Sequence, residues 1–318
     1  MGISQITAGM YAKKDKLALE QLKQIGFIKT HSADKRITDS AAGATAFSIG
    51  RKSYNSAIGV DADTVPHKTI METAQEKGLG TAVVVTSQIT HATPACFYAH
   101  QPQRYMYEAI AADFCKSKVQ IAMGGGKEHF NNRKDGLNLV DSLKAKGFSI
   151  PESLEAAASG GNKFVYFVSD TAPIRFSQGR GSYLPKASNI ALDKLSKNEK
   201  GFFLHIEGSQ IDWGGHANNA DWVVDEMLDF DHTIATVLEF AKRDQNTLVV
   251  ITADHETGGF ALNTDLENDN SWLPGWTTGS HTAVMVPVFA YGPGSEDFQG
   301  IYENTEIYHK MMNAFGWN

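Results

Sequence analysis

Short apolar runs alternate with amphipathic stretches along almost the whole chain of 318 residues. The runs are apolar on both faces, which is typical of buried parallel strands. The predicted strands are Thr81–Thr86, Val119–Met123, Phe164–Val168, Phe202–Glu207, Thr247–Ala253 and Met285–Tyr291. The predicted helices, whose apolar residues recur at helical spacing, are Leu17–Ile25, Lys68–Lys77, Tyr105–Lys116, Leu137–Lys146, Ala187–Leu195 and Ala220–Lys242. This alternation predicts an α/β sandwich with a mostly parallel sheet.

The composition indicates a globular protein with one domain over residues 1–318. Hydrophobic residues make up 42% of the chain, enough to bury a large core, and no segment is long and apolar enough to span a membrane. A net charge of -7 argues against a general nucleic-acid binder, which would normally carry a basic face. The polar stretch Asn263–Ser280 is interpreted as a surface insertion, and Pro151–Asn162 as a second irregular stretch.

The chain has two cysteines, Cys96 and Cys115, too few for a disulfide scaffold or a cysteine zinc site. They could form one disulfide in an oxidising compartment, although nothing in the sequence brings them together. The chain opens on Met1-Gly2-Ile3 without a signal-peptide pattern.

Carboxylates and imidazoles follow two of the predicted strands at the point where each strand ends. In open α/β sheets, ligands bind beyond the carboxyl ends of the strands. The group comprises Glu207, Asp212 and His216 after one strand, Asp254 and His255 after another, and His281 just before the last strand. Imidazole with carboxylate is the ligand set expected for zinc with an open coordination position. A single Asp-x-x-x-His pair is more often a hydrogen-bonding loop, so the metal interpretation depends on the joint placement of these residues.

The run Thr38-Asp39-Ser40-Ala41-Ala42 places a serine at the entry to a series of small, helix-favouring residues. A helix that begins here would direct free N–H groups and its positive dipole end toward whatever Ser40 attacks. From the local sequence alone, a serine that only caps the helix is the more common interpretation. No histidine lies close in sequence, so metal coordination, which lowers the pKa of a hydroxyl, is the more economical way to activate Ser40.

A further segment, Thr90-His91-Ala92-Thr93-Pro94-Ala95, follows the first long strand. Thr93 offers a hard oxygen ligand that suits magnesium. Arg104 could hold two phosphate oxygens with its planar guanidinium, although an arginine that opens a surface helix is the alternative. The triple glycine at 124–126 lacks the Lys-Ser/Thr of a P-loop and is interpreted as a turn.

Together these motifs resemble the alkaline phosphatase family, in its bacterial form with two zinc ions and one magnesium ion. The resemblance covers the chain in the family's order, through TDSAAGATA, ITHATPA with its trailing arginine, EGSQIDWGGH, TADHETGG and GSHTAVMVPVFAYGPGS. It implies a three-layer α/β/α sandwich around a large, mostly parallel sheet, usually in a homodimer. It also implies hydrolysis of many small phosphate monoesters, without specific nucleic-acid or membrane partners, in the periplasm or outside the cell.

The resemblance implies a role for each matching residue. Ser40 is expected to be the nucleophile that becomes phosphorylated, and Arg104 to bind the phosphate. The expected metal ligands are Asp212, His216 and His281 for the first zinc, Asp254, His255 and Ser40 for the second, and Thr93 and Glu207 for magnesium. Two zinc ions can stabilise the entering and leaving oxygens of an in-line displacement.

Three departures from the best-studied branch of the family have consequences. His91 and Trp213 occupy positions where that branch has Asp and Lys, so altered metal preference and weaker product binding are expected. A strand ending in Gly-Asp, whose Asp bridges two metal ions, is expected to be missing because the chain begins at Met1-Gly2. The alternatives are therefore a catalytically impaired metal- or phosphate-binding remnant, or a phosphodiesterase of the same superfamily. A sulfatase would carry Pro and Arg after the nucleophile, which Ala42-Gly43 does not match.

Overall fold

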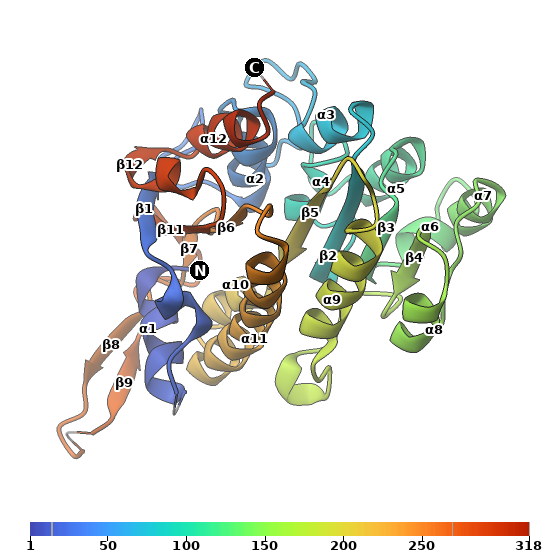
Figure 1. The fold of residues 1–318 in the computed structure, drawn as a ribbon. Coiled ribbons are helices and arrows are strands. Elements are labelled where there is room, and N and C mark those ends of the chain that lie inside the picture. The colour runs from blue at the N-terminus through green and yellow to red at the C-terminus, as the bar shows by residue number, and fades with distance from the viewer. Residues whose placement is uncertain (14, 269, 318) are drawn as a thin grey trace.

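Two four-stranded groups of strands form the centre of the molecule in the computed structural model, which describes residues 1–13, 15–268 and 270–317 (Figure 1). One group has the order β4-β3-β2-β5, and its three pairings are all parallel. The other has the order β12-β1-β11-β6, in which β11 runs antiparallel to both neighbours. The chain is thus an α/β protein with a mostly parallel sheet, as the sequence predicts.

The elements have the following bounds. The longer strands are β1 Gln24–Lys29, β2 Gly80–Gln88, β3 Ile121–Gly125, β4 Phe164–Phe167, β5 Phe202–Glu207, β6 Val249–Ile251, β11 Val286–Tyr291 and β12 Gly300–Glu303. The short ones are β7 Glu256–Thr257, β8 Ala261–Thr264, β9 Trp272–Gly275 and β10 His281–Thr282. The helices are α1 Ile3–Ala12, α2 Ser40–Ile49, α3 Ile70–Glu76, α4 Ala92–Ala95, α5 Tyr107–Lys116, α6 Glu128–Asn131, α7 Leu139–Ala145, α8 Leu154–Ser159, α9 Tyr183–Leu195, α10 Gln210–His216, α11 Ala220–Asp244 and α12 Glu306–Ala314.

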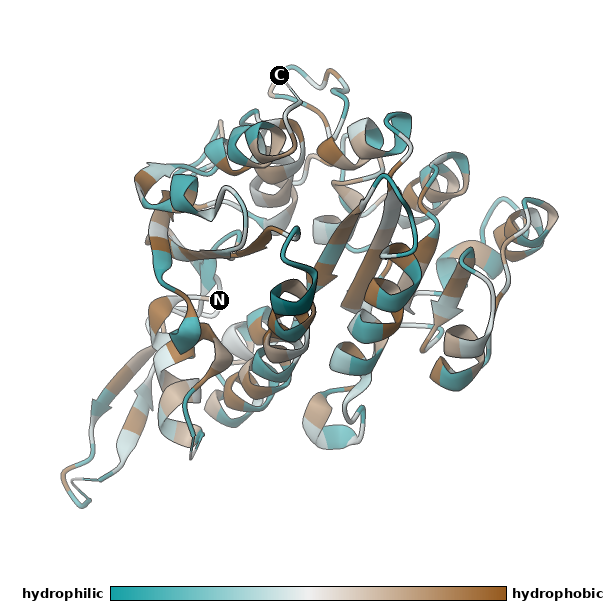
Figure 2. Ribbon diagram, viewed as in Figure 1, coloured by the Kyte–Doolittle hydropathy of each residue, from teal (hydrophilic) through white to brown (hydrophobic). Residues whose placement is uncertain are grey.

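Helices cover both faces of the parallel strands, because alternate side chains of β2 point to opposite sides. Ala82 and Val84 join an apolar cluster with Leu184 and other residues of α9. Val83 joins the larger apolar cluster on the other face, which includes Phe114 of α5. Figure 2 shows the same division, with apolar strands in the interior and polar residues on the outer helical surfaces. The carboxyl ends of these strands are therefore the edge at which polar groups can gather.

All six strands predicted from the sequence are present, with ends that differ by a few residues. The predicted helix Leu17–Ile25 is wrong: a short 3-10 turn, Ala18–Gln21, leads into strand β1. Pairing with β11 and β12 on both sides gives Gln24–Lys29 an extended backbone, which outweighs the weak helical pattern of nine residues. The irregular stretch Pro151–Asn162 contains the short helix α8, whose start is capped by Ser153.

The polar stretch at 263–280 contains part of an antiparallel hairpin, β8 and β9, that projects from the body of the molecule (Figure 1). At its base the Trp276 ring stacks on Phe260 with 4.4 Å between ring centroids. The hairpin leaves the body after β7 and returns at β10, and these two short strands pair with each other at its base.

Cys96 and Cys115 are both buried, and neither forms a disulfide in the part of the chain that the structure describes. Burial raises the pKa of both thiols, to about 12 for Cys96 and about 11 for Cys115, so both stay protonated. Across the described residues, none of the helices has the length and apolar character needed to cross a membrane.

Candidate functional site

Ser40 is the first residue of α2, and the helix that the sequence predicts does begin there. The cap is Asp39, whose carboxylate accepts a hydrogen bond from the Ala42 amide at 3.0 Å. The Ser40 side chain is therefore free of the capping role, and it is 4% exposed. Its hydroxyl lies 3.1 Å from Nε2 of His255. The positive end of the α2 dipole and a buried hydroxyl thus face the same point.

Asp254 and His255 follow β6 and lie against the first turns of α2. A Cβ atom on Gly43 would lie 2.8 Å from Cβ of Asp254, so α2 and Asp254 can lie this close together because residue 43 has no side chain. Asp254 Oδ2 lies 3.2 Å from Nε2 of His255. Burial by itself would raise the pKa of Asp254, but the neighbouring His255 holds it well below its usual range. In return, Asp254 outweighs burial and raises the pKa of His255. The pair is therefore strongly coupled beside Ser40.

Asp212, His216 and His281 form a second cluster, in which one ligand atom of each lies within 4.8 Å of the others. Asp212 and His216 lie on α10, and His281 begins β10. Asp212 Oδ1 lies 3.5 Å from Nε2 of His216 and 3.7 Å from Nε2 of His281. The imidazole of His281 also stacks on that of His255 at 3.5 Å, which places the two clusters side by side. The residues that the sequence predicts for two metal ions are thus together.

The histidine nitrogens in this second cluster show whether a metal ion suits it. Nδ1 of His216 lies 2.9 Å from the carbonyl of Gly279, and Nδ1 of His281 lies 2.8 Å from the carbonyl of Thr38. A carbonyl can only accept, so each Nδ1 carries the proton and each Nε2 offers a lone pair. The two Nε2 atoms are nevertheless 3.1 Å apart. Two lone pairs and a carboxylate that converge in this way repel one another unless a cation lies among them, so the donor set fits a divalent metal.

Glu207, at the end of β5, is surrounded by hydroxyl groups. Burial raises its pKa to about 7, against hydrogen bonds from Ser209 and Thr93 that lower it. The hydroxyl of Ser87 donates to its carboxylate at 3.4 Å. Thr93 lies on the short helix α4. Oxygen ligands of this kind, with no thiol among them, suit a hard cation such as magnesium.

Arg104 lies in the loop before α5, and its side chain is 12% exposed. It donates from Nη1 to Asp39 Oδ2 at 2.9 Å, so the capping carboxylate of α2 also orients the guanidinium. His91 lies on the other side, with its Nε2 3.4 Å from Nη2 of Arg104. The guanidinium is therefore held beside the start of α2, where Ser40 lies.

The structure places His91 against Trp213 of α10, with their rings edge-to-face at 5.9 Å. Burial, assisted by the Arg104 charge, lowers the pKa of His91 to about 4, so the imidazole is neutral at ordinary pH. Its Nδ1 is buried and has no hydrogen-bond partner among the residues that the structure describes. Trp213 brings no charge to this side of the site.

Sequence reasoning missed the residues that orient the side chains expected to bind metal. The sequence prediction weighs only Ser40 as a cap, as the alternative to its role as nucleophile, although Asp39 is as good a capping residue and precedes the helix. Thr257 donates a short hydrogen bond to Asp212 and lies 3.2 Å from Nδ1 of His255. The carbonyls of Thr38 and Gly279 carry no signal in the sequence, because every residue has one.

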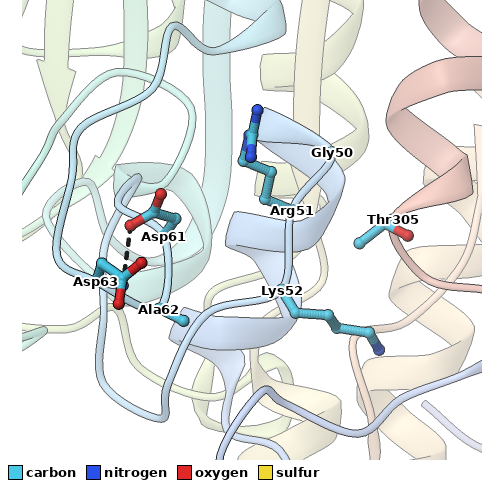
Figure 3. A pocket seen from close by; sticks show the side chains of 7 residues that line it. All are labelled: Gly50, Arg51, Lys52, Asp61, Ala62, Asp63 and Thr305. Atoms are coloured by element: carbon cyan, nitrogen blue, oxygen red, sulfur yellow. Dashed lines mark hydrogen bonds between the residues drawn. The ribbon is translucent and has the colours of Figure 1, made fainter.

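A separate surface hollow lies at the opposite end of α2 from Ser40 (Figure 3). Its lining residues carry both signs of charge and are Gly50, Arg51, Lys52, Asp61, Ala62, Asp63 and Thr305. Asp61 is engaged within its own loop, where it accepts from the amides of Asp63 and Val65 at 3.0 Å. The hollow shares no lining residue with the clusters around Ser40.

The family model described as alkaline phosphatase matches residues 3–273 and 263–317 of the chain. The chain belongs to the alkaline phosphatase family. Alkaline phosphatase 3 of Bacillus subtilis (strain 168) is 34% identical over an alignment of 406 positions, gaps included, which covers 100% of this chain and 87% of that protein. Members of the family are phosphoric monoester hydrolases, and this chain is an enzyme of that class.

Solved structures of alkaline phosphatases agree with this fold. The enzyme from the Antarctic bacterium TAB5 superposes with a TM-score of 0.96 at 46% identity, covering 100% of this chain and 95% of that one. A cold-active enzyme from a psychrophilic Shewanella sp. superposes with a TM-score of 0.91 at 31% identity, covering 99% and 97%. Two mutant structures of the TAB5 enzyme have magnesium bound in its M3 site. Metal binding thus accompanies this fold in a relative.

Proposed function

We propose that the chain hydrolyses phosphate monoesters through a phosphoserine intermediate on Ser40, with two zinc ions and one magnesium ion as cofactors. The observation that carries the proposal is the convergence of Asp212, His216 and His281 beside the pair of Asp254 and His255 at the Ser40 hydroxyl. Five ligands at the end of a sheet and one buried hydroxyl match the needs of metal-assisted phosphoryl transfer.

The proposed ligand sets follow from these contacts. Asp212, His216 and His281 would hold the first zinc through one carboxylate oxygen and two Nε2 atoms. Asp254, His255 and Ser40 would hold the second zinc, and Thr93 with Glu207 would hold magnesium. When bound, these ions supply positive charge that lowers the pKa of the Ser40 hydroxyl and offsets the charge that develops on the substrate oxygens.

The reaction would proceed in two displacements at phosphorus. Ser40 Oγ gives up its proton and forms a bond to phosphorus as the ester P–O bond breaks, and the departing alkoxide takes up one proton in exchange. Water then attacks phosphoserine, which releases inorganic phosphate and restores the Ser40 hydroxyl. Two inversions give net retention at phosphorus.

Arg104 would bind two phosphate oxygens during both displacements, because its fork is already oriented by Asp39. The free amides at the start of α2 would bind from the other side. Phosphoryl transfer depends chiefly on positioning and charge, so these contacts would contribute most of the protein's own catalysis. Because they address the phosphate group, many small monoesters would be accepted.

His91 and Trp213 would tune the site. A neutral imidazole favours a softer metal at the magnesium position, and a tryptophan supplies no cation to retain the product phosphate. Replacing His91 by Asp and Trp213 by Lys should lower the inhibition constant for inorganic phosphate. An unchanged inhibition constant would show that neither side chain affects product binding.

The deciding experiment is hydrolysis of a chromogenic aryl phosphate monoester before and after treatment with a chelator. Activity should disappear with the chelator and return when zinc and magnesium are added. Ser40→Ala should abolish turnover and the acid-stable label that phosphate leaves on the protein. Zinc bound without turnover would favour the impaired metal-binding remnant, and a preference for diesters would favour the phosphodiesterase.

We also propose that the enzyme acts as a homodimer in the periplasm or outside the cell. This proposal comes from the likeness to bacterial relatives, of which Escherichia fergusonii has one at 29% identity over 99% of this chain. Light scattering of the purified protein, combined with size-exclusion chromatography, would give the mass of the assembly directly.

A further inference from the structure

A buried ion cluster lies away from the residues proposed to bind metal. The side chains of Arg180, Glu226 and Asp229 are each 1% exposed. Arg180 donates from Nη1 to Glu226 Oε1 at 3.1 Å and from Nη2 to Asp229 Oδ2 at 2.9 Å. Glu226 and Asp229 are three residues apart on α11, so they share one face of that helix. One cation is therefore enclosed with two carboxylates.

Such a cluster contributes little net stability, since the cost of burying charges offsets their attraction. The cluster instead holds the segment that carries Arg180 in a fixed position. Gly179 and Gly181, on either side, have φ values of 101° and 60°, a conformation that lets the chain turn inward and out again at the arginine. The amide of Phe176 in the same loop donates to Glu226 Oε1 at 3.0 Å. The loop from 173 to 181 is thus bound to α11 at several points.

This loop also contacts the start of α10. The side-chain amide of Gln210, the first residue of α10, donates to the carbonyl of Pro173 at 2.9 Å and approaches that of Ile174 at 3.5 Å. The carbonyl of Ile174 also accepts from Arg180 Nη1 at 3.2 Å. Arg180 and Gln210 therefore bind the carbonyls of two consecutive residues, Ile174 and Pro173, and this backbone segment connects the arginine to α10. Gln210 is itself buried and donates to the carbonyl of Thr86 at the end of β2.

Helix α10 needs such support because it is short and rich in glycine. It has seven residues, of which Gly214 and Gly215 are two, and a helix of this length is unstable without tertiary contacts. Its far end is held by close packing: a Cβ on Gly214 would lie 2.9 Å from Val223, and one on Gly215 would lie 2.7 Å from the carbonyl of Thr257. Its near end is held by Gln210 and by the preceding Ser209, whose amide donates to Thr86 Oγ1 at 2.8 Å.

We propose that Arg180 is a positioning residue for the metal site: through the Pro173–Ile174 backbone and Gln210 it helps to fix the start of α10, so that Asp212 and His216 face His281. The proposal rests on the proposed function only in requiring that these three residues bind zinc. Arg180 touches neither the substrate nor the metal ligands. It acts by holding Asp212, His216 and His281, before zinc binds, close to the positions that they would occupy around the ion.

The test measures the zinc affinity of folded protein, by competition with a chromogenic chelator well below the unfolding temperature. Arg180→Met removes the ion cluster's cation, and Gln210→Met removes the connection while leaving the cluster intact. Each should weaken zinc binding roughly tenfold, because changes to outer contacts of metal ligands reduce affinity by about 10- to 100-fold. The double variant should be no weaker than the worse single variant, since both changes break one chain of contacts. His281→Asn identifies which zinc belongs to this cluster.

Arg133→Met provides a matched control. The Arg133 side chain is also buried and also holds a loop in place. It donates to the carbonyls of Glu108 at 2.6 Å and His129 at 3.2 Å, and its hydrogen bonds and ion pair involve no residue of α10 or α11. This variant should lose thermal stability and keep the zinc affinity of the parent protein.

Three outcomes would overturn the proposal. Unchanged zinc affinity in Gln210→Met would do so even if Arg180→Met fails to fold. Loss of stability without loss of affinity in Arg180→Met would show that the cluster is only structural. Equal weakening in Arg133→Met would show a general effect of lost stability. If the parent protein itself binds no zinc, the proposed function fails instead, which is a distinguishable result.

Discussion

At the scale of single residues, Asp39 connects Ser40, the proposed nucleophile, to Arg104, the arginine proposed to bind phosphate. Its carboxylate caps α2 at the Ala42 amide, accepts from the Ser56 amide at 3.0 Å and pairs with Arg104 at 2.9 Å. One side chain thus fixes both the helix that presents Ser40 and the direction of the guanidinium. A change here should affect stability and phosphate binding together.

We therefore predict that Asp39→Ala lowers the free energy of unfolding by about 1–2 kcal/mol, as lost helix caps do. It should also raise the inhibition constant for phosphate about tenfold, which corresponds to about 1.4 kcal/mol of lost binding. Without Asp39 the Arg104 guanidinium loses its orientation, which weakens phosphate binding. This loss outweighs the gain from removing the negative charge of Asp39 near phosphate, because two backbone amides already stabilise that charge. Denaturant unfolding and product inhibition measure the two effects. Ser153→Ala, which removes the cap of the outlying helix α8, should change stability alone.

At the scale of elements, the strands and the strand-end residues could be predicted from the sequence, while their supports could not. The run Phe202–Glu207 matches β5 residue for residue, because its apolar residues mark a strand even though all six are only half-buried at the edge of their group. Strand β1 was missed because only its pairing with β11 and β12, more than 250 residues away, makes it extended. Asp212 and His216 could be singled out by their spacing. The Arg180 cluster could not, because Gly-Arg-Gly and two acidic residues on a helix suggest solvent-exposed positions.

Helix α2 shows how packing limits substitution at Gly43. Alanine normally stabilises a helix by about 1 kcal/mol relative to glycine. Here its Cβ would lie 2.8 Å from Cβ of Asp254, so α2 and the segment with Asp254 and His255 must separate. We expect Gly43→Ala to lower kcat at least tenfold and to weaken zinc binding, as measured by steady-state kinetics and chelator competition. Gly161→Ala is the control, since nothing lies within 4 Å of the added atom. Unaltered kinetics in Gly43→Ala would mean that α2 can move away from Asp254 and His255 without loss of activity.

Helix α11 carries two buried aspartates with different surroundings. Asp231 is fully partnered, by Lys13 Nζ at 2.7 Å and the Ala18 amide at 2.7 Å. Oδ1 of Asp229 has no hydrogen-bond partner among the described residues, and burial raises the pKa of Asp229 above its ordinary 3.8, although Arg180 opposes the shift. A raised pKa means that the folded state retains a proton that the unfolded state has lost. Stability contributed by this group is therefore present below pH 3.8 and falls as the pH rises through the folded-state pKa.

It follows that Asp229→Asn should keep or increase the unfolding temperature at pH 7, because the amide removes a buried charge and still accepts from Arg180. Its advantage over the parent protein should shrink as the pH falls toward 3.8. Asp231→Asn should instead cost about 1–3 kcal/mol at pH 7, since it breaks a partnered contact. Thermal unfolding of both variants at several pH values tests this. A large loss of stability in Asp229→Asn at neutral pH would contradict the view that the cluster of Arg180, Glu226 and Asp229 holds one negative charge too many.

At the scale of the whole molecule, the site lies where the two four-stranded groups meet. Glu207 and helix α10 follow β5 of the all-parallel group, whereas Asp254 and His255 follow β6 of the mixed group. His281 lies between β9 and β11, and Ser40 reaches the same point from the long connection after β1. No hydrogen-bonded strand pair joins the two groups within the described residues. Metal ions held by ligands from both groups would therefore connect them.

This arrangement predicts that metal removal destabilises the whole fold and not only the site. A ligand that binds the folded state alone adds about 2.7 kcal/mol at a concentration of 100 Kd and about 1.4 kcal/mol for each further tenfold increase. Calorimetry should thus show an unfolding temperature that drops by several degrees with chelator and rises with the logarithm of free zinc. His216→Asn should flatten that dependence, because it removes one of the converging Nε2 lone pairs. His309→Asn on α12 replaces a histidine outside the cluster and should leave the dependence unchanged. If the unfolding temperature of the parent protein does not change with zinc concentration, the two groups of strands stay together without the metal.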